Sequence, residues 1–199
     1  LLIAYENSNV DIIENGNTII NMVDIKMKSI PGSKTINHIY FIGQLAYLSC
    51  AFGIVVIDME KYEVKDTYII GPSGSNLNVR AITADASSFY AATDNGVYKA
   101  AVNSPDLANY AEWTVMGGLP AGIYNSIVSF NGKVYTNYSA YLSGGLTQED
   151  TLFVLNSGTW NYFGGGNDVV YSLTASASRM VIAFDSSVAV YDVNETFLN

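Results

Sequence analysis

Short runs of alternating apolar and polar residues recur along the chain, and turn residues bound each run. The first apolar residue after one such turn is Val10, then Ile54, then Val97, so successive copies lie about 44 residues apart. The same marker returns at Val188, about two periods later. A period in the forties that contains several short strands is typical of a β-propeller, in which each unit buries its faces only against its neighbours. The pattern therefore predicts an all-β propeller.

Each repeat is predicted to contain four strands. In the second repeat, alternation and turn residues place them at 37–42, 45–50, 54–58 and 64–70. The first repeat lacks the first strand and the last repeat lacks the fourth, which gives about four and a half blades, or eighteen strands. Within one propeller segment, 1–199, the predicted parts are a partial blade 1–30, blades 34–71, 77–117 and 123–164, and an incomplete blade 168–199. Because a closed ring is built from whole blades, we expect a partial ring of a larger propeller in a longer protein.

Two dipeptides and two tryptophans give more local predictions. Asn95-Gly96 and Asn131-Gly132 favour type I′ hairpin turns, because both central residues of such a turn need a positive φ. Trp113 and Trp160 occupy equivalent places in two repeats, so we expect both to be buried in the core or between blades.

Composition narrows the function classes. The formal net charge of −9 repels phosphate backbones, and the sequence has no basic stripe, so nucleic-acid binding is not expected. Cys50 is the sole cysteine, which excludes an internal disulfide and a thiolate metal cluster; within its apolar strand we expect it to be buried. No apolar run reaches the length that spans a bilayer, so no direct membrane span is predicted.

Catalytic motifs are missing from the sequence. His38 is the sole histidine and lies beside an apolar strand marker without a nucleophile motif, so we expect a structural histidine. Arg80 and Arg179 are too few for the arginine cluster with which a sialidase-type propeller binds a carboxylate. The sequence contains neither a phosphate loop followed by a helix nor a calcium loop. We therefore expect no enzyme, no cofactor and no metal.

The fourth repeat carries an insertion between its second and third strands, predicted at residues 139–150. In a propeller this connection opens on the face that usually binds ligands and partners, so the insertion is the candidate site. The alternative is a tolerated surface insertion, because lengthening a loop costs little free energy. The candidate anchors and polar groups are Tyr138, Tyr141, Leu142, Gln148, Glu149 and Asp150.

Several segments resemble one known family. They are 1–11, 34–41, Phe52-Gly53-Ile54-Val55-Val56-Ile57-Asp58, Ala91-Ala92-Thr93-Asp94-Asn95-Gly96-Val97-Tyr98-Lys99-Ala100 and 126–133. Together they resemble the N-terminal propeller of PorZ-type proteins of the type IX secretion system of Bacteroidetes. These proteins are in turn similar to the sensor propellers of hybrid two-component regulators of the same phylum.

The resemblance implies a longer protein with a signal peptide, further blades and a C-terminal sorting domain. It implies export to the periplasm or the outer-membrane surface, in the complex that attaches secreted proteins to anionic lipopolysaccharide. The implied partners are a sortase-like protease or a cell-surface polysaccharide, and the family offers no catalytic motif.

Two functions remain open from the sequence. The first is a non-catalytic binding and scaffolding propeller of the secretion system. The second is a periplasmic propeller that senses an oligosaccharide for a hybrid two-component regulator. The domains that follow this segment in the gene would distinguish the two, and a propeller lyase or glycosidase is a third, less favoured, possibility.

Overall fold

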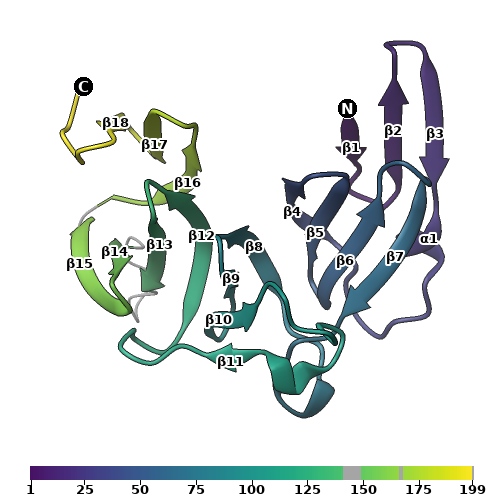
Figure 1. Ribbon diagram of the computed structural model, residues 1–199, viewed down its shortest axis with the longest axis horizontal. Coiled ribbons are helices and arrows are strands. Elements are labelled where there is room, and N and C mark those ends of the chain that lie inside the picture. Colours follow the sequence, from purple (N-terminus) through teal and green to yellow (C-terminus); the bar gives the residue numbers. More distant parts are fainter. Residues whose placement is uncertain (141–148, 166–167, 199) are drawn as a thin grey trace. The chain divides into compact units, whose positions relative to one another are not determined.

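The computed structural model describes residues 1–140, 149–165 and 168–198, and in these ranges the chain forms five antiparallel sheets (Figure 1). The first sheet contains β1 (Leu2–Ala4), β2 (Val10–Glu14) and β3 (Thr18–Met22). The second contains β4 (Ile36–Ile42), β5 (Leu45–Cys50), β6 (Gly53–Asp58) and β7 (Glu63–Tyr68). The third contains β8 (Val79–Ala84), β9 (Ser88–Thr93), β10 (Gly96–Ala101) and β11 (Thr114–Val115).

The last two sheets complete the series. The fourth contains β12 (Ile123–Phe130), β13 (Lys133–Ala140), β14 (Glu149–Asn156) and β15 (Thr159–Gly165). The fifth contains β16 (Val170–Ala175), β17 (Arg179–Phe184) and β18 (Val188–Asp192). Helical structure within the described ranges is limited to α1 (Asp24–Met27) and two 3₁₀ turns, Pro72–Gly74 and Tyr110–Glu112.

The predicted fold class is confirmed. The described ranges contain eighteen strands in sheets of three, four, four, four and three, and sequential strands pair within each sheet. No helix in these ranges is long and apolar enough to cross a membrane. The C-terminal segment lies beside β18, the third strand of the last sheet. Tyr191 pairs with Phe197, and the Leu198 N–H donates to the Val190 carbonyl at 2.8 Å.

The predicted bounds of the insertion are wrong at both ends. Ser139 pairs with Asp150 and Ala140 pairs with Glu149, so all four residues belong to the extended strands β13 and β14. Polar side chains made this stretch resemble a loop. The strands nevertheless continue here because their buried polar side chains bond to one another, as shown below.

One of the two predicted type I′ turns is confirmed. Asn131 and Gly132 have φ values of 48° and 74°. At the other dipeptide the prediction is wrong, because among its two residues only Gly96 has a positive φ. Gly96 instead pairs with Thr93, and the Thr93 Oγ1 donates to the Gly96 carbonyl and accepts from the Asn95 N–H. The central residues of this turn are therefore Asp94 and Asn95.

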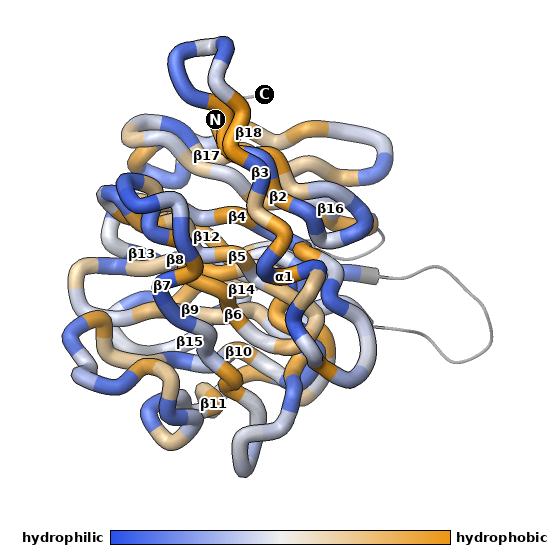
Figure 2. The backbone as a smooth tube through the Cα atoms, turned by 90° about the vertical axis from the view of Figure 1, so that its right-hand side faces the viewer, coloured by the Kyte–Doolittle hydropathy of each residue, from blue (hydrophilic) through white to orange (hydrophobic). Residues whose placement is uncertain are grey.

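The chain divides into two compact units, 1–80 with 105–113 and 81–104 with 114–199. In the first unit, apolar residues of β1–β3 and α1 pack with those of β5 and β6, the strands that Figure 2 colours largely as hydrophobic. Cys50 is buried in this core, and burial raises the pKa of its thiol to about 12, so it is a structural residue rather than a nucleophile.

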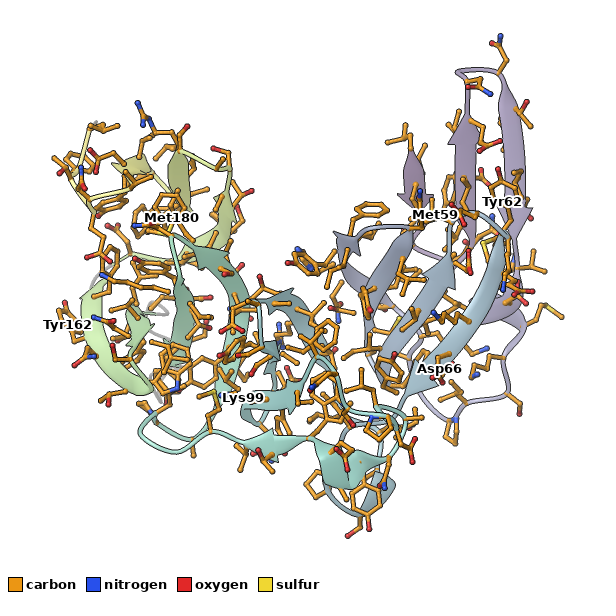
Figure 3. The ribbon with its side chains drawn as sticks, viewed as in Figure 1. Met59, Tyr62, Asp66, Lys99, Tyr162 and Met180 are labelled. Atoms are coloured by element: carbon orange, nitrogen blue, oxygen red, sulfur yellow. The ribbon has the colours of Figure 1, made fainter. Side chains whose placement is uncertain are left out.

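Two apolar clusters lie among the described residues of the second unit. One includes Trp160 and Tyr124 and joins residues of β8–β10 with those of β12–β15. The other joins β12–β14 with the last sheet and includes Met180, which is fully buried and is labelled in Figure 3. Trp113, in the first unit, packs against Tyr68 with ring centroids 6.3 Å apart. Both tryptophans are therefore buried, as predicted.

Candidate binding site at the end of the fourth sheet

The structure places three of the predicted site residues on strands. Tyr138 lies on β13, whereas Glu149 and Asp150 lie on β14. Tyr141, Leu142 and Gln148 fall outside the described residues. The candidate site is therefore built from the end of the fourth sheet, where β13 and β14 lead into and out of the segment 141–148.

The carboxylate of Asp150 is fully buried and accepts hydrogen bonds from Ser139, Asn137 and Val170. Its Oδ1 accepts from the hydroxyl of Ser139 at 2.8 Å. Its Oδ2 accepts from the Asn137 side-chain amide at 3.1 Å and from the backbone N–H of Val170 at 2.8 Å. Asp150 thus joins β13 and β14 to the start of β16, and it is not the loop residue that the sequence predicted.

The hydrogen bonds continue through Asn137 into β12. Asn137 is fully buried, and its Oδ1 accepts from the backbone N–H of Ser126 at 2.8 Å. Thr136 donates from its hydroxyl to the Ser126 carbonyl at 2.7 Å. The side-chain amide of Asn125 donates to the Ser139 hydroxyl at 2.5 Å. Buried polar groups that bond one another in this way fix neighbouring strands in one arrangement.

Sequence reasoning missed Asn125, Ser126 and Asn137 as members of this network. A signal was present, because the strand 133–140 carries Thr136, Asn137 and Ser139 where the equivalent strand of the second repeat is largely apolar. Polar residues in a strand that is otherwise expected to be buried indicate either exposure or mutual bonding, and here they bond one another.

Tyr138 packs against the start of β12. Its ring lies 5.5 Å from that of Tyr124, and its hydroxyl donates to the Ala121 carbonyl at 3.4 Å. Gly122 has a φ of 144°, and a Cβ there would lie 2.9 Å from the Tyr138 ring, so this close approach requires glycine. Tyr138 is half-buried, which leaves part of its ring accessible beside the buried network.

The amides, hydroxyls and carboxylate of this network are buried or half-buried and bond one another, so among the residues described here the partly accessible ring of Tyr138 is the group that a partner could contact. An aromatic ring suits contact with a peptide or a sugar. Among the described residues, no group of three or more His, Cys, Asp or Glu side chains could hold a metal ion. His38 lies elsewhere, on β4, and burial lowers its pKa.

Antiparallel sheets that repeat one strand order and one register define this chain as a segment of a β-propeller. The family model described as the N-terminal β-propeller domain of PorZ, of the type IX secretion system, matches residues 1–114. This match covers more than half of the chain, which therefore belongs to the PorZ N-terminal β-propeller family. The candidate site at 125–170 lies beyond the matched residues.

Solved structures of three proteins are similar in fold. PorZ, a surface component of the type IX secretion system of Porphyromonas gingivalis, is 17% identical with a TM-score of 0.76, over 98% of this chain and 25% of that chain. The extracellular domain of a putative hybrid two-component system from B. thetaiotaomicron is 15% identical with a TM-score of 0.58, over 100% of this chain and 29% of that chain. Hsv2 from Kluyveromyces lactis is 9% identical with a TM-score of 0.54, over 100% and 58% of the two chains. No curated protein matches the chain.

Proposed function

We propose that this segment belongs to an exported, surface-associated protein of the type IX secretion system and that it binds and positions partners without catalysis. The observation that carries the proposal is the family match over residues 1–114, together with the likeness to PorZ over 98% of the chain. PorZ is described as an essential bacterial surface component of that system in Porphyromonas gingivalis. The chain spans only 25% of PorZ, so the partners of the whole protein are part of the proposal.

The fourth sheet is the proposed binding region. Asp150 and its donors hold β13 and β14 together up to the pair Ala140 and Glu149, where the segment 141–148 begins and ends. A rigid base of this kind supports recognition by the residues that it presents. The proposed partners are the sortase-like protease of the secretion system or a cell-surface polysaccharide such as lipopolysaccharide.

The absence of catalysis is likewise proposed from the residues. His38 is the sole histidine in the sequence, and the side chains that surround the buried Asp150 are committed to the hydrogen bonds described above. The proposal fails if the purified protein turns over a glycan or peptide and this turnover is lost in Glu149→Ala or Asp150→Asn.

A loop replacement in the whole protein tests the binding role. Residues 141–148 are replaced by Asn-Gly, which leaves Ser139, Ala140, Glu149 and Asp150 in their strands. We expect the variant to fold and to capture less sortase-like protease or lipopolysaccharide in a pull-down. A variant with the residues of 141–148 in scrambled order, at the original length, separates loop sequence from loop length.

Two tyrosines of the fourth sheet provide a matched pair for the same assay. Tyr138→Ser removes the ring beside the segment, whereas Tyr162→Ser removes a tyrosine of β15 that is 66% exposed and points outward in Figure 3. Reduced capture by Tyr138→Ser and normal capture by Tyr162→Ser would support the proposed region. Equal capture by both, and by the shortened loop, would refute it.

The second candidate function is oligosaccharide sensing in a hybrid two-component regulator. The likeness to the B. thetaiotaomicron extracellular domain, with a TM-score of 0.58 over 100% of this chain, favours it. The two candidates predict different neighbours in the gene. A transmembrane segment followed by a kinase would support the sensor, and a sorting domain would support the secretion component.

A further inference from the structure

Two buried polar atoms face one another across β4 and β5 in the first compact unit. His38 pairs with Ser49 in the register of these strands. Neither the Nδ1 of His38 nor the Oγ of Ser49 has a hydrogen-bond partner among the residues that the structure describes. Ser49 is fully buried. A buried polar atom without a partner costs free energy, so two on one cross-strand pair call for a physical explanation.

The geometry brings the two side chains close without joining them. Directly opposed residues of an antiparallel pair point to the same face of the sheet, with Cβ atoms about 4.5–5.5 Å apart. The neighbouring residue Asn37 cannot serve as a partner, because its side-chain amide donates to the Asn78 Oδ1 at 2.8 Å and to the Val79 carbonyl at 2.7 Å. His38 and Ser49 are therefore within reach of one small molecule that bonds both.

Side-chain size leaves room beside Ser49. In the register of the second sheet, Ser49 pairs with Ile54 and Ile54 pairs with Tyr68, so these three side chains share one face with His38. Ser49 is the smallest of them, and its neighbours on either side are bulky. Ser49 therefore fills less volume than its neighbours in this row, next to the imidazole of His38.

Two other sheets have a different residue at the position of Ser49. Matching the hairpins Ile42–Leu45 and Phe130–Lys133 places Asn137 where the second sheet has Ser49, and Ser126 where it has His38. There the longer Asn137 side chain reaches the Ser126 N–H directly. Matching the next turns places the fully buried Ala92 at the position of Ser49 in the third sheet, so an apolar residue is also accommodated.

We propose that the space between His38 and Ser49 is a binding site for one ordered water molecule. The water donates a hydrogen bond to the imidazole Nδ1 of His38, and it accepts one from the hydroxyl of Ser49. Burial lowers the pKa of His38, which favours the neutral imidazole, and the proposal takes the tautomer that carries its proton on Nε2, in which Nδ1 is the acceptor. The water would join β4 to β5 beside the irregular pairing between Ile36 and His38. In the fourth sheet the Asn137 side chain joins the first two strands in a similar way.

Replacement of Ser49 by alanine in the whole protein tests the site, because the proposal predicts the direction in which the melting temperature changes. If the hydroxyl bonds a water that also bonds His38, Ser49→Ala loses that bond and lowers the melting temperature of the propeller by about 2–4 °C. If the hydroxyl has no partner, its removal leaves the melting temperature unchanged or raises it, and the proposal is overturned. Ser29→Ala, at an exposed serine, is the control and should change nothing.

A crystal structure of the unaltered whole protein gives an independent answer. The proposal requires a density peak within hydrogen-bond distance of both the His38 Nδ1 and the Ser49 Oγ. A high-resolution map without such a peak refutes it. Because the third sheet already accommodates alanine at this position, we expect Ser49→Ala to fold; the crystal structure decides the question if it does not.

Discussion

The second and fourth sheets have similar strand pairing, but the buried side chains of their second strands differ in polarity. In both, the pairing of the first strand with the second shifts at a similar place, between Ile36 and His38 in one sheet and between Tyr124 and Ile127 in the other. The second strand of the second sheet is buried and largely apolar from Ala46 to Cys50. In the fourth sheet, Thr136, Asn137 and Ser139 are buried and hydrogen-bonded in the equivalent strand.

The difference shows that the repeat specifies strand pairing more strictly than it specifies the core. By the same matching, Asp150 stands where the second sheet has Phe52, and both side chains are almost completely buried. Phe52 is stabilised by apolar contacts and needs no particular partner. A buried carboxylate needs hydrogen-bond donors, and Asn137, Ser139 and Val170 supply such donors to Asp150, so we expect the fourth sheet to depend on this network.

The same substitution at these two positions is the strongest test of this contrast. Asp150→Leu leaves the Asn137 amide, the Ser139 hydroxyl and the Val170 N–H without their acceptor. We expect the free energy of unfolding to fall by about 3–5 kcal/mol in denaturant titrations of the whole protein. Phe52→Leu keeps an apolar side chain in an apolar core and should cost about 1 kcal/mol.

Asp150→Asn is the informative intermediate, because it keeps one acceptor oxygen and loses the charge. Its cost should lie between those of the two leucine variants. Equal costs for Asp150→Leu and Phe52→Leu would mean that the fourth sheet does not depend on its polar network.

The two tryptophans extend the comparison to a second pair of equivalent positions. The Nε1 of Trp113 donates to the Leu107 carbonyl at 2.9 Å, whereas the buried Nε1 of Trp160 has no partner among the described residues. We expect Trp113→Phe to lower the free energy of unfolding by about 2 kcal/mol, because it loses both volume and a hydrogen bond. Trp160→Phe also removes a polar atom that burial disfavours, so it should cost about 1 kcal/mol less. A larger cost at Trp160 in the same denaturant titration would contradict this assignment.

The sequence predicted what local patterns determine. Alternation and the spacing of markers such as Ile54 and Val97 predicted the strands, their order and the propeller class. The extension of β13 and β14 was not predictable in this way, because Ser139 and Asp150 are polar and become strand residues only through partners on β12, β13 and β16. At Asn95-Gly96 the dipeptide could not reveal which residues are central, because the pairing of Thr93 with Gly96 decides this. Among the candidate site residues, Glu149 and Asp150 were predicted to lie in the insertion but lie on the strand β14.

Tyr135 in the fourth sheet, which matches Tyr47 in the second, donates a hydrogen bond to Glu195, and we expect this contact to depend on pH. Burial opposes the ionisation of Glu195, but hydrogen bonds from Lys133 and Tyr135 outweigh it and hold the pKa of Glu195 below its usual value. A lowered pKa in the folded state contributes stability at pH values above the unfolded-state pKa. This stability is lost as the pH falls through the folded-state pKa.

We therefore expect Glu195→Gln to lower the free energy of unfolding by about 1.5 kcal/mol at neutral pH. The difference from the unaltered protein should shrink in acid, because the carboxylate of the unaltered protein is then protonated as well. Thermal unfolding of both proteins across this pH range measures the effect. Lys133→Met should show the same convergence, and a difference that does not depend on pH would argue against the ionised contact.

The smallest expected effect concerns the hairpins that join the first two strands of each sheet. In the fourth sheet, Gly132 has a φ of 74°, and a Cβ added there would meet nothing within 4 Å, so any cost of Gly132→Ala is conformational. We expect this cost to be about 1 kcal/mol, because an L-residue with a side chain disfavours the left-handed region. The matching residue of the second sheet is Gln44, which is exposed and has no positive φ. Gln44→Ala should therefore change the free energy of unfolding by less than about 0.5 kcal/mol. Equal costs of the two substitutions in denaturant titrations would mean that the two sheets share one turn geometry. The two sheets would then differ in the buried side chains of their second strands and not in this turn.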